Sequence, residues 1–137
     1  MKKFTKAVSE IIIHCTATPP DRDLHVDDIT RYHRQRGFVT VGYHYLIARD
    51  GSVEEGRAAD CIGAHCLGHN DRSVGIAYVG GLDKDSKPAD TRTVCQRAAL
   101  KRLVAELRLR YPGASVHGHN EFAAKACPCF DVAREFR

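Results

Sequence analysis

Side chains that can bind a metal are concentrated near the end of this 137-residue chain, in the stretch HGHNEFAAKACPCF at 117–130. His117 and His119 are two residues apart, as are Cys127 and Cys129, so each pair would share one face of an extended strand. Imidazole and thiolate are ligands that zinc prefers. The spacing differs from that of common structural zinc sites, so it leaves two interpretations open: a metal site, or loop histidines with ordinary thiols.

His14 lies far earlier in the chain, at the end of an apolar run of three isoleucines. A continuous apolar run is typical of a buried strand. A buried imidazole without a partner is costly, so His14 is expected either to be hydrogen-bonded in the core or to act at the end of its strand. The residues alone leave both interpretations open. Cys15, the next residue, is expected to point to the opposite face and to pack in the core.

The elements that must position these side chains are those of an α/β protein. The sequence predicts one domain, with a central mixed β-sheet flanked by about three helices. The expected strands cover 8–14, 43–49, 52–55, 73–79 and 115–118, and the expected helices cover 26–36, 93–111 and a short segment after Phe130. Residues 57–72 are expected to be irregular, because glycines and an Asn-Asp pair interrupt any periodic pattern.

Local signals support individual elements. Asp50-Gly51 is a strong signal for a two-residue hairpin. Thr93 and Gln96 match a capping box at the start of the longest helix. Cys95, inside that helix, is expected to be a small buried residue. The apolar stripe of the helix is formed by Ala99, Leu100, Leu103, Val104 and Leu107.

Composition excludes some classes of protein. A hydrophobic content of 43% and a charged content of 28% are those of an ordinary folded domain. The net charge of +4 is mild, and no concentrated basic patch indicates a nucleic-acid partner. No apolar stretch reaches the roughly 20 residues of a membrane span. The start of the chain lacks a signal-peptide pattern, so we expect synthesis in the cytoplasm, and most of the 6 cysteines are expected to be free thiols.

Four stretches, in order from residue 11 to 131, together resemble a known family. They are IIIHCTATPP, VGYHYLIARDGSVEEGR, GAHCLGHNDRSVGIAYVGG and HNEFAAKACPCFD. The chain resembles zinc-dependent N-acetylmuramoyl-L-alanine amidases of the phage-lysozyme type, which are related to peptidoglycan recognition proteins. The resemblance covers nearly the whole chain and implies a single amidase domain over residues 1–137.

The resemblance implies one zinc ion per chain, with His14, His119 and Cys127 as its ligands. His119 is favoured over His117 because the ligand of the family directly precedes an N-E or H-E pair. Three protein ligands leave one position for water, which is the pattern of catalytic zinc.

Two further residues would act beside the metal. Lys125 matches the family's lysine and would stabilise the oxyanion of the tetrahedral intermediate as a point charge. Tyr43 matches the family's tyrosine; a phenol is a poor base at neutral pH, so a hydrogen-bonding role is expected. His44, the neighbour of Tyr43, would point to the opposite face of its strand and have a structural role.

The implied activity is hydrolysis of the amide bond between N-acetylmuramic acid and L-alanine in peptidoglycan. His65 lies in the segment that lines the substrate groove of related amidases, which makes it a candidate substrate-binding residue. We expect a monomer that acts on the cell wall after its release, and a phage or prophage origin.

Two alternative functions stay open. One is a non-catalytic module that binds peptidoglycan, although related recognition domains that lack hydrolysis have lost the metal-binding cysteine. The other is an amidohydrolase with Cys127 as nucleophile and His119 as base. Cys129 departs from the small residue usual at that position, and it would either compete for the metal or pair with Cys127 on oxidation.

Overall fold

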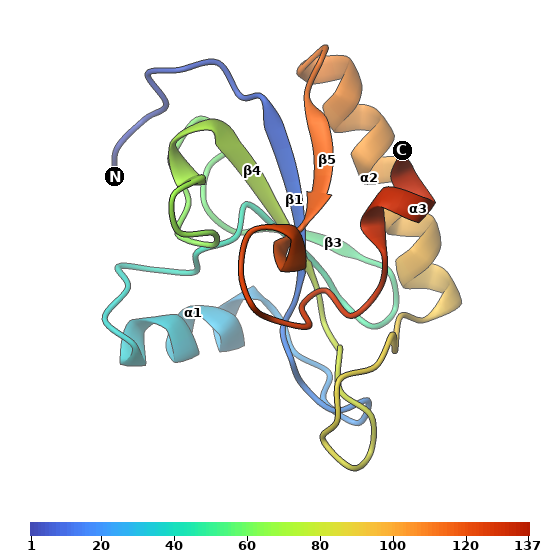
Figure 1. Cartoon of the computed structure of the whole chain (residues 1–137). Coiled ribbons are helices and arrows are strands. Elements are labelled where there is room, and N and C mark those ends of the chain that lie inside the picture. The colour runs from blue at the N-terminus through green and yellow to red at the C-terminus, as the bar shows by residue number, and fades with distance from the viewer.

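A five-stranded sheet organises the chain, and the computed structural model describes all residues from 1 to 137. The strands are β1 (Glu10–Cys15), β2 (Tyr45–Ile47), β3 (Val53–Glu55), β4 (Ser73–Tyr78) and β5 (Ser115–Gly118). They lie in the order β3-β2-β4-β1-β5. Figure 1 shows β4, β1 and β5 side by side. Only β3 is antiparallel to its neighbour, so the predicted mixed sheet is confirmed.

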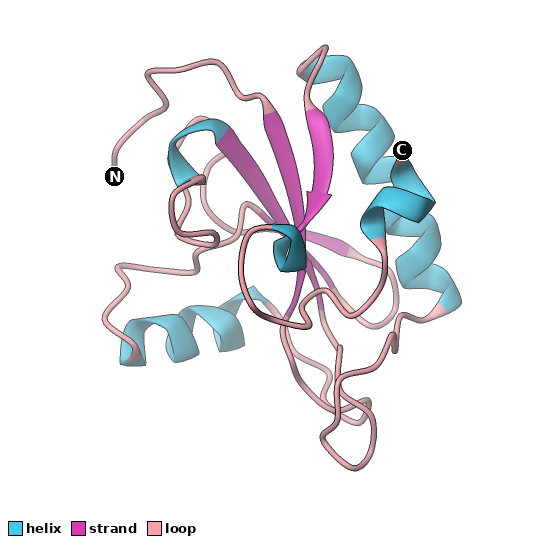
Figure 2. Ribbon diagram, viewed as in Figure 1, coloured by secondary structure: helices cyan, strands magenta, loops and turns pink.

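Helices cover both faces of the sheet, as the α/β prediction requires. They are α1 (Val26–Gln35), α2 (Val94–Arg110) and α3 (Val132–Phe136), with the short 3-10 helices η1 (Asn70–Arg72) and η2 (His119–Glu121). Figure 2 shows α1 on one side of the strands and α2 with α3 on the other. None of these helices combines the length and the apolar character needed to cross a membrane.

The two faces of the sheet are covered unequally. A cluster of 14 buried residues joins the sheet to α2 and α3, and it includes every residue of the predicted apolar stripe of α2. A cluster of only 6 joins the sheet to α1. Ile11, Ile13 and Cys15 belong to the larger cluster, which confirms that Cys15 packs in the core. Since side chains alternate along a strand, His14 faces the less covered side.

The second predicted strand starts later than expected. It begins at Tyr45 rather than at residue 43, because the chain is still bent at His44. Alternation along a strand therefore does not determine the directions of Tyr43 and His44, whose rings have different neighbours. The Tyr43 ring lies 5.2 Å from that of His14, and the His44 ring lies 5.8 Å from that of His65.

The hairpin between β2 and β3 has a three-residue loop rather than the predicted two-residue loop. The Ala48 N–H donates to the Ser52 carbonyl, which leaves Arg49, Asp50 and Gly51 between them. Gly51 has a φ of 89°, a conformation that glycine adopts without strain. A Cβ at Gly51 would also approach the Cβ of Cys95 to 2.8 Å.

Cys95 is exposed, so the prediction that it is buried was wrong. The buried stripe of α2 begins at Gln96, and Cys95 lies to one side of it, against the hairpin loop. All cysteines of the chain are free thiols, which agrees with the sequence-based expectation.

The predicted capping box at the start of α2 is present, and it predicts a stability effect. The Thr93 hydroxyl accepts the Gln96 N–H at 3.0 Å and donates to the Arg49 carbonyl at 2.8 Å. Thr93→Ala removes both bonds and is expected to lower the free energy of unfolding by about 1–2 kcal/mol in urea denaturation. Thr93→Ser keeps the hydroxyl and is the matched control; an alanine variant as stable as the serine variant would contradict this role.

Candidate metal centre and active site

Three segments that are distant in the sequence meet at one edge of the sheet. His14 lies near the end of β1, and His119 directly follows β5 as the first residue of η2. Because β1 and β5 are parallel, with Ile13 opposite Gly118, their carboxyl ends lie side by side. Cys127 comes from the loop before α3. Its Sγ accepts the backbone N–H of Cys15 at 3.2 Å, which holds this loop against the end of β1.

The ligand atoms of His14, His119 and Cys127 all lie within 4.8 Å of one another. The Nδ1 atoms of the two histidines are 3.1 Å apart. Both imidazoles are buried and the thiol is half-buried. Two imidazole nitrogens and one sulfur are a donor set suited to zinc, and three protein ligands are the number found in catalytic zinc sites. The donor set therefore fits the metal that the sequence predicts.

His117, the alternative ligand, does not join this group. Its Nδ1 lies 2.9 Å from a Glu121 carboxylate oxygen and its Nε2 lies 2.7 Å from the Ser115 hydroxyl. Although His117 and His119 are only two residues apart, β5 ends at Gly118, so the strand alternation that would align the two side chains stops between them.

The surroundings favour the protonation states in which these groups bind a metal. Hydrogen bonds from the Cys15 side chain and backbone lower the pKa of Cys127, which favours its thiolate. Burial, assisted by the charge of Lys125, lowers the pKa values of His14 and His119. Both imidazoles are therefore neutral near pH 7. Metal ligands must be deprotonated in this way.

Tyr43 and Lys125 border the same group. Burial raises the pKa of Tyr43, so its phenol stays protonated and can act only as a neutral hydrogen-bonding group. Lys125 lines the cleft in front of the group, as do Tyr43 and the three ligand candidates. The structure thus brings together all five residues that the resemblance singled out at the centre.

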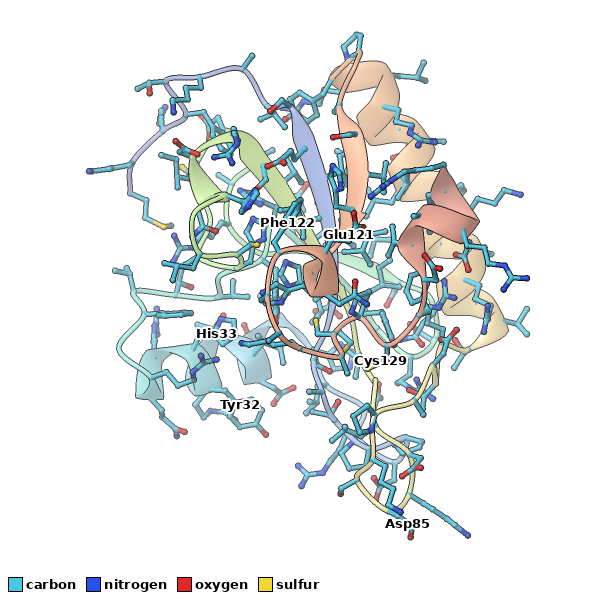
Figure 3. The ribbon with its side chains drawn as sticks, in the orientation of Figure 1. Tyr32, His33, Asp85, Glu121, Phe122 and Cys129 are labelled. Atoms are coloured by element: carbon cyan, nitrogen blue, oxygen red, sulfur yellow. The ribbon has the colours of Figure 1, made fainter.

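The cleft has a volume of about 650 Å³, and none of the residues that line it is acidic. Its wall includes residues that the sequence analysis did not single out, namely Arg36, Phe38 and Phe122. Figure 3 labels two residues that line the cleft: Phe122, beside η2, and His33, on α1. No local motif marks these residues, since only the packing of α1 and η2 around the end of β1 makes them neighbours.

His65 also lines the cleft, but its closest contact is with His14. The His65 Nδ1 lies 2.8 Å from the His14 Nε2, and His65 is buried. Burial lowers the pKa of His65 to about 3, so the ring is neutral. His44 has a structural role, as predicted: it accepts the Gly75 N–H and its Nε2 lies 2.7 Å from the Cys61 carbonyl.

Cys129 lies outside the group of possible metal ligands. Its Sγ is 3.9 Å from that of Cys15 and 3.3 Å from the Gly81 carbonyl, so it packs on the α2 side of the sheet. Burial raises the pKa of Cys129 to about 12, which keeps it a thiol. Cys15 is therefore a cysteine within reach of Cys129. The expected competition for the metal does not fit this position.

Comparisons with known proteins agree with the site. The model of the N-acetylmuramoyl-L-alanine amidase family matches residues 4–130. The endolysin of Klebsiella phage KP32 is 43% identical over 134 residues, covering 96% of this chain and 89% of that protein.

Solved structures show the same similarity. The endolysin of the Thermus scotoductus bacteriophage Ph2119 has a TM-score of 0.80 and 30% identity, covering 93% of this chain and 80% of that chain. A variant of Drosophila PGRP-LB in complex with tracheal cytotoxin has a TM-score of 0.79 and 26% identity, covering 93% of this chain and 78% of that one. By sequence and by fold, this chain belongs to the N-acetylmuramoyl-L-alanine amidase family.

Proposed function

We propose that this amidase hydrolyses the bond between the lactyl group of N-acetylmuramic acid and L-alanine in peptidoglycan, using water activated by one zinc ion held by His14, His119 and Cys127. The observation that carries the proposal is the convergence of these three side chains, with ligand atoms within 4.8 Å of one another, at the base of a cleft. A zinc ion bound there would keep a position for water, lower the pKa of that water and polarise the scissile carbonyl.

The chain's own residues would supply the remaining stabilisation. Lys125 lines the cleft and lies two residues before Cys127 in the sequence. Its ammonium group would offset the negative charge that develops on the oxygen of the scissile carbonyl. Tyr43 stays protonated and packs against the His14 ring, so it would donate a hydrogen bond rather than remove a proton. These two residues and the metal would act on the same carbonyl group.

The charge of the cleft also suits the proposed substrate. Arg36 and Lys125 line it without any carboxylate among the lining residues, so it would attract the carboxylates of a peptidoglycan stem peptide. A similar fold is recorded with tracheal cytotoxin bound, and the relative from Klebsiella phage KP32 is named an endolysin. We therefore propose a monomeric enzyme of phage or prophage origin that is made in the cytoplasm and degrades the cell wall after release.

Two other functions make different predictions. A non-catalytic binding module would not require the complete set of His14, His119 and Cys127 that this chain retains. A cysteine hydrolase would use the Cys127 sulfur as nucleophile, but that sulfur already accepts the Cys15 N–H and faces two imidazoles in ligand positions. The zinc amidase explains the presence and arrangement of all three side chains.

Removal of metal should abolish activity. Treatment with a chelator such as 1,10-phenanthroline is expected to stop digestion of purified cell wall, and added Zn²⁺ should restore it. The products to measure are new L-alanine amino termini and new reducing sugar ends. Only amino termini are expected. Activity that survives complete metal removal would support the cysteine hydrolase, and reducing ends would indicate a glycosidase.

Substitution of the two neighbouring cysteines should separate their roles. Cys127→Ser is expected to lose bound zinc and activity, because a hydroxyl is a much weaker zinc ligand than a thiolate. Cys129→Ser is the matched control and should keep one zinc per chain, since its Sγ faces Cys15. Zinc content after dialysis is the measurement, and loss of zinc in the Cys129 variant would contradict this assignment.

Lys125→Met should affect catalysis rather than metal binding. Loss of one group that stabilises the oxyanion is expected to lower kcat by about 10²–10³-fold. Lys101→Met, on the exposed side of α2, is the control and should have wild-type kinetics. A rise in KM with unchanged kcat would instead mean that Lys125 only binds substrate in the ground state.

A further inference from the structure

The second ring nitrogen of His14 begins a chain of hydrogen bonds that leads away from the cleft. His14 Nε2 lies 2.8 Å from His65 Nδ1. His65 Nε2 lies 3.2 Å from the Ser73 hydroxyl, and that hydroxyl donates to the His69 carbonyl at 2.7 Å. His14, His65 and Ser73 are all buried. The chain of hydrogen bonds therefore links a proposed metal ligand on β1 to the start of β4.

The last hydrogen bond of this series, from Ser73 to the His69 carbonyl, fixes the direction of the others. A carbonyl oxygen only accepts, so the single hydroxyl hydrogen of Ser73 must go to His69, and Ser73 must accept from His65 Nε2–H. A neutral imidazole with hydrogen on Nε2 has a lone pair on Nδ1. His65 Nδ1 therefore accepts the Nε2–H of His14. His14 then carries its hydrogen on Nε2 and a lone pair on Nδ1, the ring nitrogen that lies beside His119. A metal ligand needs such a lone pair.

The sheet provides a dedicated space for the His65 ring. Gly75 on β4 pairs with Ile12 on β1, and a Cβ at Gly75 would come within 2.6 Å of the His65 ring. A Cβ at Gly63 would also come within 2.7 Å of the ring, at its Cδ2. Any larger residue at these positions would displace the ring. The fold thus holds His65 against His14 rather than presenting it freely to the cleft.

We propose that His65, supported by Ser73, is a positioning residue that fixes the tautomer and the orientation of His14 for metal binding. This inference rests on the proposed zinc site, and it assigns His65 a role other than the substrate contact expected from the sequence. Partners of this kind restrict the ring rotation of a ligand histidine and make its coordinating nitrogen more basic, and their loss typically costs about 10–100-fold in metal affinity.

The test is a set of substitutions measured by zinc affinity, determined by competition with a chromogenic chelator at constant pH. His65→Leu removes the acceptor and should weaken zinc binding by about 10–100-fold. His65→Asn places an amide oxygen near the position of Nδ1 and should restore most of the affinity. Ser73→Ala keeps the ring but removes its support, and it should weaken binding less than His65→Leu does.

A second readout reports the geometry of the site. The visible absorption spectrum of the Co²⁺-substituted protein should change in His65→Leu and return toward the wild type in His65→Asn. His33→Leu is the matched control: His33 is another buried histidine of the cleft, but it accepts the Gly42 N–H and has no hydrogen bond to His14. This control should retain wild-type zinc affinity and the wild-type cobalt spectrum.

The outcomes separate this inference from the proposed function. Wild-type zinc affinity in both His65→Leu and Ser73→Ala would overturn the positioning role, even if the wild-type protein is an active zinc amidase. A higher KM with unchanged zinc affinity would show that His65 contacts substrate instead. Failure of the wild-type protein to bind zinc would refute the proposed metal site itself. Circular dichroism of each metal-free variant verifies its folding. If His65→Leu does not fold, Ser73→Ala still tests the positioning role of His65.

Discussion

The parallel pairing of β1 with β4 on one side and β5 on the other is the interaction on which the site depends. It places the carboxyl ends of three strands at one edge, where the chain leaves the sheet and its side chains can converge. His14 near the end of β1 and His119 just after β5 become neighbours through this register alone. On the β4 side, the same register sets Gly75 and Ser73 beside β1, which gives the His65 ring its space and its hydrogen-bond partner.

The unequal covering of the sheet turns this edge into a reactive site. The long helix α2 seals one face with the larger hydrophobic cluster, and the sulfurs of Cys15 and Cys129 lie on that side. The shorter helix α1 covers less of the opposite face, and the cleft opens beside it. Strand alternation alone therefore separates a packing residue, Cys15, from a residue of the candidate metal centre, His14, at adjacent positions.

Burial then determines the chemistry of the groups at the base of the cleft. Removing imidazoles from water disfavours their charged forms, so His14, His65 and His119 stay neutral and keep lone pairs available. The same burial keeps Tyr43 protonated. Cys127 is the exception, because hydrogen bonds from Cys15 stabilise its thiolate more than burial destabilises it. One environment thus provides neutral imidazole nitrogens, a sulfur whose thiolate form is favoured and a phenol that can donate.

The sequence by itself determined the class of fold, the order of its elements, the five residues around the centre and the family. The fold class and the order of elements follow from local patterns such as apolar runs and a capping box. The five residues and the family follow from the resemblance of four motifs in a fixed order to a known family. The tertiary structure adds the reason why His117 lies apart from His119, which the resemblance already favoured: β5 ends between them. It also decided that Cys129 faces Cys15 and that His65 contacts His14. Such contacts join segments far apart in the chain, and no local spacing encodes the register and packing that bring them together.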